Sequence, residues 1–80
     1  MSTHSNKYLL ATFTERYSTR IEIRGWIFRG RRFMDVRKWF LKDGRWHPTR
    51  EGIIIREHEF VRMKEAVELA AGIPVGENAR

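Results

Sequence analysis

The chain has 80 residues, no cysteine and a formal net charge of +6. The lack of cysteine excludes a disulfide framework and a thiolate metal site, and no segment approaches the roughly 20 apolar residues of a membrane span. A domain of this length buries a modest core, so association of two copies is the expected extra source of stability. With no secretory signal at its polar start, the chain is predicted to be cytoplasmic, and nucleoid-associated if bacterial.

The positive charge is concentrated between residues 16 and 50. This stretch carries eleven of the sixteen basic residues, three acidic residues and seven aromatic residues. Residues 51–71 carry three basic and five acidic residues. Charges of one sign that gather on one part of a fold attract a partner of opposite sign. Interleaved rings and arginines favour a ligand with successive phosphates and flat bases, which describes single-stranded nucleic acid.

The chain is expected to begin with a polar tail at residues 1–7, followed by a first strand at Tyr8–Glu15 that is rich in apolar, aromatic and threonine residues. A second strand is predicted at Arg20–Phe28, where isoleucines alternate with charged and aromatic residues. Such alternation is typical of a strand with two chemically different faces.

Two hairpin turns are predicted to follow. Arg29-Gly30 is a two-residue turn that leads into a third strand at Arg31–Lys42. Asp43-Gly44 is a stronger turn signal, because both residues tolerate positive φ, and it leads into a fourth strand at Arg45–Ile55. Pro48 interrupts the first half of this strand, which should therefore be an edge or bulged stretch.

A helix is predicted at Glu57–Ala71 because its apolar residues recur with helical spacing. Gly72 is a good residue to follow a helix, and residues 73–80 are expected to form a flexible tail. The domain thus spans residues 8–72. It is predicted to be an α+β fold of four successive antiparallel strands and one helix, and the helix is expected to cover part of one face of the sheet. The apolar stripe consists of Phe60, Met63, Val67 and Ala70.

No arrangement of residues predicts catalysis or a cofactor. The three histidines have no metal-ligand spacing to one another, and the serines lack a nucleophile-elbow motif. No glycine-rich loop is followed by the Gly-Lys-Ser/Thr of a phosphate-binding loop. We therefore predict a protein that is not an enzyme and that holds no metal or cofactor.

Alternation along the second and third strands predicts a binding face opposite the isoleucines. Exposed rings stack bases with little regard to sequence, each stack being worth roughly 1–3 kcal/mol, and arginines between the rings neutralise phosphates. Taken singly, Phe33 and Trp46 are assigned to core packing. The residues predicted on the binding face are Arg24, Trp26, Phe28, Arg37 and Trp39.

Three blocks of the sequence together resemble a known family. They are Phe28-Arg29-Gly30-Arg31, Asp35-Val36-Arg37-Lys38-Trp39-Phe40 and Pro48-Thr49-Arg50-Glu51-Gly52-Ile53. Over about residues 20–70 the chain resembles the single-stranded-DNA-binding domain of the eukaryotic transcriptional positive cofactor four, with its bacterial and phage relatives. The resemblance implies a curved four-stranded antiparallel sheet with one helix, a homodimer, and sequence-tolerant binding of single-stranded DNA in channels on the sheets.

The resemblance also implies roles for individual residues. Phe28 is the implied stacking ring at the end of the second strand, and Arg29 and Arg31 stand where the family has lysines on the DNA backbone. Arg37 and Arg50 match basic residues of the family. All five residues are therefore expected to contact DNA.

Two positions conflict with the family pattern. Phe40 matches a stacking tryptophan, whereas alternation places Trp39 on the open face, and a bulge in the third strand would reconcile the two. Both residues stay candidates, and Phe40 is favoured. Glu51 stands where the family has a DNA-binding lysine, so it should weaken or reshape that end of the channel.

Two other functions stay open from the sequence. The chain could act as a transcription cofactor whose basic surface docks an acidic partner of the transcription machinery, or it could bind single-stranded RNA, because nothing in these residues reads a 2′-hydroxyl. The helix residues Phe60, Met63 and Val67 are expected to stabilise helix packing and the dimer.

Overall fold

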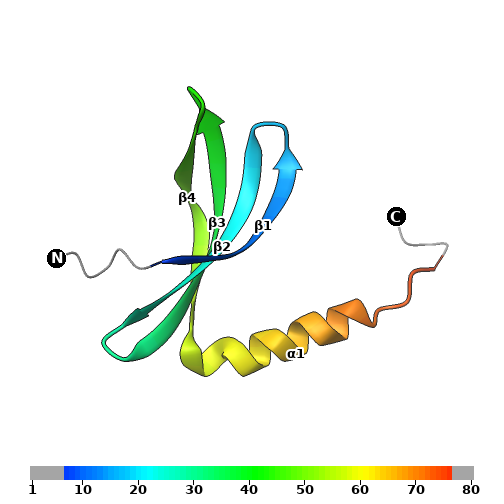
Figure 1. Ribbon diagram of the computed structural model, residues 1–80. Coiled ribbons are helices and arrows are strands. Elements are labelled where there is room, and N and C mark those ends of the chain that lie inside the picture. Colours follow the sequence, from blue (N-terminus) through cyan, green and yellow to red (C-terminus); the bar gives the residue numbers. More distant parts are fainter. Residues whose placement is uncertain (1–6, 77–80) are drawn as a thin grey trace.

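The fold is a curved antiparallel sheet with one helix, seen in a computed structural model that describes residues 7–76 (Figure 1). Residues 1–6 and 77–80, which hold most of the two predicted tails, lie outside this range. The strands follow one another in space as they do in the chain, and a 3₁₀ turn (Glu57–Glu59) leads into helix α1 (Phe60–Ala71). The strands are β1 (Tyr8–Arg16), β2 (Thr19–Phe28), β3 (Arg31–Lys42) and β4 (Arg45–Arg56). The predicted α+β arrangement of four antiparallel strands and a C-terminal helix is confirmed.

Two tight hairpin turns connect β2 to β3 and β3 to β4. Arg29 and Gly30 have φ angles of 54° and 76°, and Asp43 and Gly44 have φ angles of 54° and 75°. Positive φ at both central residues gives a turn whose twist matches that of the flanking strands. Both turns predicted from the sequence are therefore confirmed.

The pairing of β2 with β3 sorts their side chains into two faces. It runs without interruption from Thr19 opposite Phe40 to Phe28 opposite Arg31, and cross-strand partners share a face. One face, called here the basic–aromatic face, carries on these strands Arg20, Glu22, Arg24, Trp26, Phe28, Arg31, Phe33, Asp35, Arg37 and Trp39. The opposite face, called the apolar face, carries Ile21, Ile23, Ile27, Met34, Val36 and Phe40, together with the polar residues Thr19, Arg32 and Lys38.

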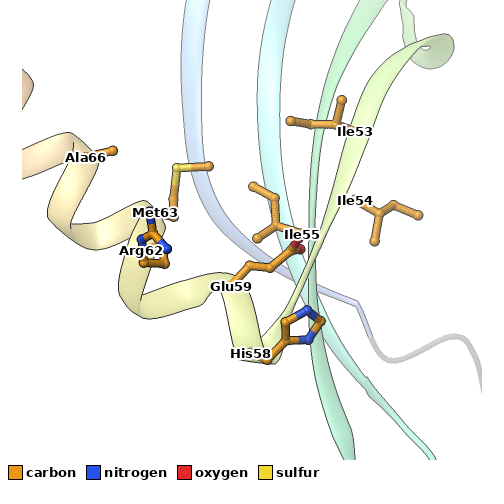
Figure 2. Close-up of a pocket in the computed structure, with 8 residues that line it drawn as sticks. All are labelled: Ile53, Ile54, Ile55, His58, Glu59, Arg62, Met63 and Ala66. Atoms are coloured by element: carbon orange, nitrogen blue, oxygen red, sulfur yellow. The ribbon is translucent and has the colours of Figure 1, made fainter.

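The helix lies on the side of the apolar face. Ile53 and Ile55 of β4 point toward the helix, where Met63 projects toward them, whereas Ile54 points to the other side of the sheet (Figure 2). Beyond its first turns α1 extends away from the sheet (Figure 1), and none of its residues is buried. The first two residues of its predicted stripe, Phe60 and Met63, are half-buried, whereas Val67, at 59% exposure, and Ala70 are exposed.

The hydrophobic core of a single copy is very small. Among residues 7–76 Ile55 is the one buried apolar residue, at 5% exposure. The apolar face leaves large side chains in solvent, with Phe13 55% and Ile53 59% exposed. The radius of gyration is 15.5 Å, against about 12 Å for a compact domain of this length. The chain is thus a single-layer sheet whose apolar face is largely open.

A carboxylate anchors the start of the helical segment to the sheet. Glu57 accepts hydrogen bonds from the backbone amide and from the guanidinium of Arg32, both at 2.9 Å. The bond from this amide, with the nearby guanidinium charge, holds the pKa of Glu57 below its usual value. Glu59 reaches back and accepts a bond of 2.9 Å from the amide of Arg56. These contacts set the direction in which the chain leaves β4.

The Asp43-Gly44 turn gives a direct test of the backbone geometry. Alanine at position 44 would have to adopt a φ near 75°, which costs an L-residue roughly 1–2 kcal/mol. We expect Gly44→Ala to lower the free energy of unfolding by about that amount, measured by urea titration at fixed protein concentration. Gly72→Ala is the matched control, because Gly72 has a φ of −93° that alanine adopts freely. Equal stability of the two variants would contradict the turn assignment.

Candidate nucleic-acid interface

Two arginines of β2 lie over indole rings on the basic–aromatic face. The guanidinium of Arg20 is 4.1 Å from the ring centroid of Trp46, and that of Arg24 is 4.7 Å from the ring centroid of Trp39. A cation over an aromatic face is attracted by the negative charge of the π-system. The side chains of Arg20 and Arg24 remain 27% and 29% exposed, so part of each guanidinium faces solvent.

A third group of rings continues the same face toward the other end of the sheet. Trp26 and Phe33 stack with ring centroids 5.4 Å apart and an interplanar angle of 16°. The ammonium of Lys7 lies 4.6 Å from the centroid of the Trp26 ring. The face is therefore a row of rings with cations placed over several of them.

Sequence reasoning missed part of this row. It assigned Phe33 and Trp46 to the core, but both are half-buried on the basic–aromatic face. Trp46 pairs with Leu41 across the Asp43-Gly44 turn, and Leu41 has the same parity as Trp39. Counting through the two-residue turn would have placed Trp46 beside Trp39.

A buried carboxylate holds the two β2 arginines in place. Glu22 is 1% exposed, and its two carboxylate oxygens accept bonds of 2.8 Å from the Nε groups of Arg20 and Arg24. Residues two apart on a strand share a face, which brings all three side chains together. A buried carboxylate needs such partners, because taking an unpaired charge out of water is very costly. Glu22 therefore fixes the positions from which both arginines lie over their tryptophans.

Arg37 is held in a similar way on β3. Its Nε lies 3.2 Å from each carboxylate oxygen of Asp35, a residue that is 8% exposed. One terminal nitrogen of Arg37 donates a bond of 2.9 Å to the carbonyl of Thr49. Gly52 is the cross-strand partner of Arg37, and a Cβ at Gly52 would lie 2.7 Å from the guanidinium carbon. The glycine thus leaves the space that the guanidinium occupies.

The irregularity between β3 and β4 lies opposite Lys38. Arg37 pairs with Gly52, but Trp39 pairs with Pro48, so three residues of β4 face one residue of β3. The three residues are Thr49, Arg50 and Glu51. Because the pairing of β3 with β2 stays regular, the extra residues belong to β4. The bulge suggested for the third strand is therefore wrong, whereas the prediction that the Pro48 half of the fourth strand is an edge or bulged stretch is confirmed.

This geometry separates the two candidate stacking rings. Trp39 lies on the basic–aromatic face beneath Arg24. Phe40 lies on the apolar face, where its ring stacks on His47 with centroids 5.3 Å apart. The structure thus brings Trp39, but not Phe40, together with Arg37.

The other predicted contact residues line the same face or its end. A shallow cleft contains Arg50 beside Trp39 and Arg37. At the tip of the β2–β3 hairpin, the guanidinium of Arg29 lies 5.1 Å from the ring centroid of Phe28, and Phe28 is 47% exposed. The full lining of the cleft is Lys7, Arg24, Trp26, Asp35, Arg37, Trp39, Pro48, Thr49, Arg50 and Ile54.

Glu51 makes its ion pair away from this row. Its carboxylate lies 3.4 Å from the ammonium of Lys38, which also lies 3.5 Å from the carboxylate of Glu15. The charge of Glu15, followed by that of Glu51, raises the pKa of Lys38 above its usual value. Lys38 belongs to the apolar face, so the acid that departs from the family pattern is paired with a cation on the opposite side of the sheet.

No group of three or more potential metal ligands occurs among residues 7–76. The same part of the chain contains no helix with the length and apolar character needed to cross a membrane.

Comparison with known proteins gives one family and two related structures. The family described as Transcriptional Coactivator p15 (PC4) matches residues 16–66. A PC4 homologue from Burkholderia pseudomallei K96243 is similar in its tetragonal crystal form, with 33% identity and a TM-score of 0.68 over 82% of this chain and 98% of its own. In its orthorhombic form the identity is 31% and the TM-score is 0.71, over 91% and 100% of the two chains.

A more distant similarity concerns the fold alone. The bacteriophage T5 homologue of the eukaryotic transcription coactivator PC4, implicated in recombination-dependent DNA replication, is 18% identical with a TM-score of 0.55. The matched region covers 80% of this chain and 73% of the phage protein chain. A search of curated protein sequences finds no match.

The contact between Gly52 and Arg37 predicts a steric effect of substitution. A Cβ at position 52 would lie 2.7 Å from the Arg37 guanidinium carbon and 2.9 Å from the carbonyl oxygen of Val36, so both strands must shift. We expect Gly52→Ala to lower the free energy of unfolding by about 1–3 kcal/mol and to shift the Nε–H resonance of Arg37 in NMR spectra.

Gly25→Ala is the control for this substitution. Its Cβ would meet the end of the flexible Leu10 side chain at 3.1 Å and a carbonyl oxygen at 3.5 Å, so its cost should be smaller. A larger loss of stability for Gly25→Ala would contradict the assigned role of Gly52.

Proposed function

Because the chain belongs to the family of the Transcriptional Coactivator p15 (PC4), we propose that it binds single-stranded DNA as a homodimer, with little preference for sequence. The resemblance inferred from the sequence is thereby confirmed. The family is one of DNA-binding coactivators that are not enzymes. Preference for single-stranded DNA and formation of a homodimer go beyond family membership, and the following observations support them.

The basic–aromatic face is the observation that carries the proposal. Its rings lie in a row across three neighbouring strands, β2, β3 and β4, with cations between and over them. Unpaired bases expose π-faces that such rings can stack, whereas a duplex hides these faces within its own stack. Phosphates need cations with free donors. Three arginines along the face make no ion pair within residues 7–76, namely Arg29, Arg31 and Arg50.

The geometry favours Trp39 over Phe40 as the stacking ring of β3. Trp39 lies on the same face and in the same cleft as Arg37 and Arg50. Phe40 stacks on His47 on the apolar face. Phe28 supplies a second exposed ring at the hairpin tip. We therefore place the bound strand along β2 and β3 on the basic–aromatic face.

Binding to single and double strands tests this proposal. We expect the chain to bind an oligo-dT strand more tightly than a matched duplex, with an affinity that falls as salt rises. Trp39→Ala should weaken dT binding about tenfold, since one base stack is worth roughly 1–3 kcal/mol, and Phe40→Ala should weaken it less. Fluorescence anisotropy at several salt concentrations measures each affinity, and equal or tighter binding of the duplex would overturn the proposal.

The open apolar face supports a homodimer. A sheet must bury one face against another layer, yet this face leaves Phe13 and Ile53 more than half exposed and buries Ile55 alone. The helix carries further exposed apolar side chains, including Val67 at 59%. A second copy placed on this face would supply the missing layer while leaving the basic–aromatic face accessible.

Two adjacent isoleucines offer a matched test of the dimer. Ile53 is 59% exposed on the apolar face and Ile54 is 47% exposed on the opposite face. We expect Ile53→Gln to raise the dimer dissociation constant by about tenfold or more, because burial of an isoleucine is worth roughly 1.5–3 kcal/mol, whereas Ile54→Gln should leave it unchanged. Sedimentation equilibrium measures both constants, and a monomeric wild-type chain at micromolar concentration would contradict the dimer.

A second candidate function is suggested by the description of the family as a coactivator. In this alternative the chain contacts the transcription machinery, and DNA binding is secondary. Trp39→Ala separates the two functions, because it should remove base stacking and leave an electrostatic protein contact intact.

Competition between DNA and RNA strands of equal length decides between the two nucleic acids. For a bacterial source, the proposed DNA binding would place the chain at the nucleoid in the cytoplasm.

A further inference from the structure

We propose that Glu22 and Asp35 are positioning residues that divide the basic–aromatic face into a centre for bases and a rim for phosphates. The inference rests on the proposed function, and it states how the single strand lies on the face. It starts from a contrast between two groups of arginines. The first group is held by buried carboxylates, and the second makes no ion pair within residues 7–76.

The held arginines occupy the centre of the face. Arg20 and Arg24 share the two oxygens of Glu22, and Arg37 contacts both oxygens of Asp35. In each of them Nε and one terminal nitrogen already lie against a carboxylate, so this two-nitrogen edge of the guanidinium is not free to grip a phosphate. The other terminal nitrogen of Arg37 also has a partner, the carbonyl of Thr49 at 2.9 Å. A phosphate brought to this region would meet three arginines whose charge is largely offset by two carboxylates and whose Nε edges are already occupied.

The same arrangement leaves the guanidinium faces available. Arg20 and Arg24 lie over Trp46 and Trp39, and their side chains are 27% and 29% exposed. A guanidinium is planar and delocalised, so its face stacks on a base while its edge is hydrogen-bonded. The centre of the face is thus suited to bases rather than phosphates.

The unpaired arginines lie at the margins of this centre. Arg29 and Arg31 flank the hairpin tip, and Arg50 lies in the bulge of β4. All three are exposed and keep their fork of donors free for phosphate oxygens. The strand should therefore lie with its bases toward the rings and its phosphates toward the rim, an arrangement that base pairing prevents.

Stability alone does not account for the buried carboxylate. Bringing a carboxylate and two guanidinium groups out of water costs about as much as their attraction returns, and apolar replacements are often at least as stable. Glu22 is nevertheless 1% exposed in the middle of a face whose rings remain partly accessible. Its bonds to the two arginines that lie over Trp46 and Trp39 match a role in holding a stacking platform.

Two oligonucleotide probes and two arginine variants test whether bases bind at the centre of the face and phosphates at its rim. The probes are oligo-dT and an abasic deoxyribose-phosphate oligonucleotide of the same length, which offers phosphates without bases. We expect Arg24→Gln to weaken dT binding about tenfold, with no change on the abasic strand and an unchanged salt dependence. Arg31→Gln should weaken binding of both strands and reduce the slope of log K against log salt by about 0.7.

A charge-matched pair of glutamates completes the test. Glu22→Gln frees two guanidiniums, so it should strengthen binding of the abasic strand and steepen the salt dependence, whereas Glu51→Gln makes the same charge change on the Lys38 side and should alter neither. A purely structural Glu22 would instead weaken binding of both strands. If Glu22→Gln unfolds, as circular dichroism would show, the comparison of Arg24 with Arg31 decides.

The outcomes separate the two proposals. Equal losses on dT and on the abasic strand for Arg24→Gln, or an unchanged salt slope for Arg31→Gln, would overturn the division of the face. A wild-type chain that prefers duplex to dT would contradict the proposed function itself.

Discussion

The unbroken pairing of β2 with β3 is the constraint on which the rest of the structure depends. From Thr19 opposite Phe40 to Phe28 opposite Arg31, no residue interrupts the register. A slip by one position would move every ring and every arginine of one strand to the other face. The Arg29-Gly30 turn enforces this register through positive φ at both of its residues. The row of rings and cations therefore follows from one turn and one regular ladder.

Most of the fold was accessible from the sequence because alternation and turn chemistry are local signals. They placed Arg37 and Trp39 on one face, and the structure agrees. Pro48 indicated that the first half of β4 is an edge or bulged stretch, which the structure confirms. The exact position, with three residues opposite Lys38, is defined by pairing with another strand and not by local sequence. The contact of Glu51 with Lys38 was missed for the same reason. Burial of Glu22 depends on what the folded sheet places around it, which alternation alone does not reveal.

The two faces of the sheet have opposite physical requirements. The apolar face exposes side chains such as Ile53 and Phe13, whose transfer out of water is the main available source of further stability. The basic–aromatic face needs contact with solvent and ligand to act. A partner copy on the apolar face meets the first requirement without competing with the second. The proposed dimer would thus let a chain with one buried apolar side chain within residues 7–76 sustain a surface that contains two buried carboxylates.

A buried acid within a surface for a polyanion is contradictory only if every arginine is counted as a phosphate ligand. An arginine that is free in solvent loses up to about 2 kcal/mol of side-chain entropy when a ligand orders it. Glu22 orders Arg20 and Arg24 during folding, so this cost does not fall on the binding step. The carboxylate lowers the net charge of the centre, and with it the non-specific attraction of any polyanion. What it leaves is a set of fixed planar cations over rings, which under the proposed function would favour ligands whose bases are free to stack.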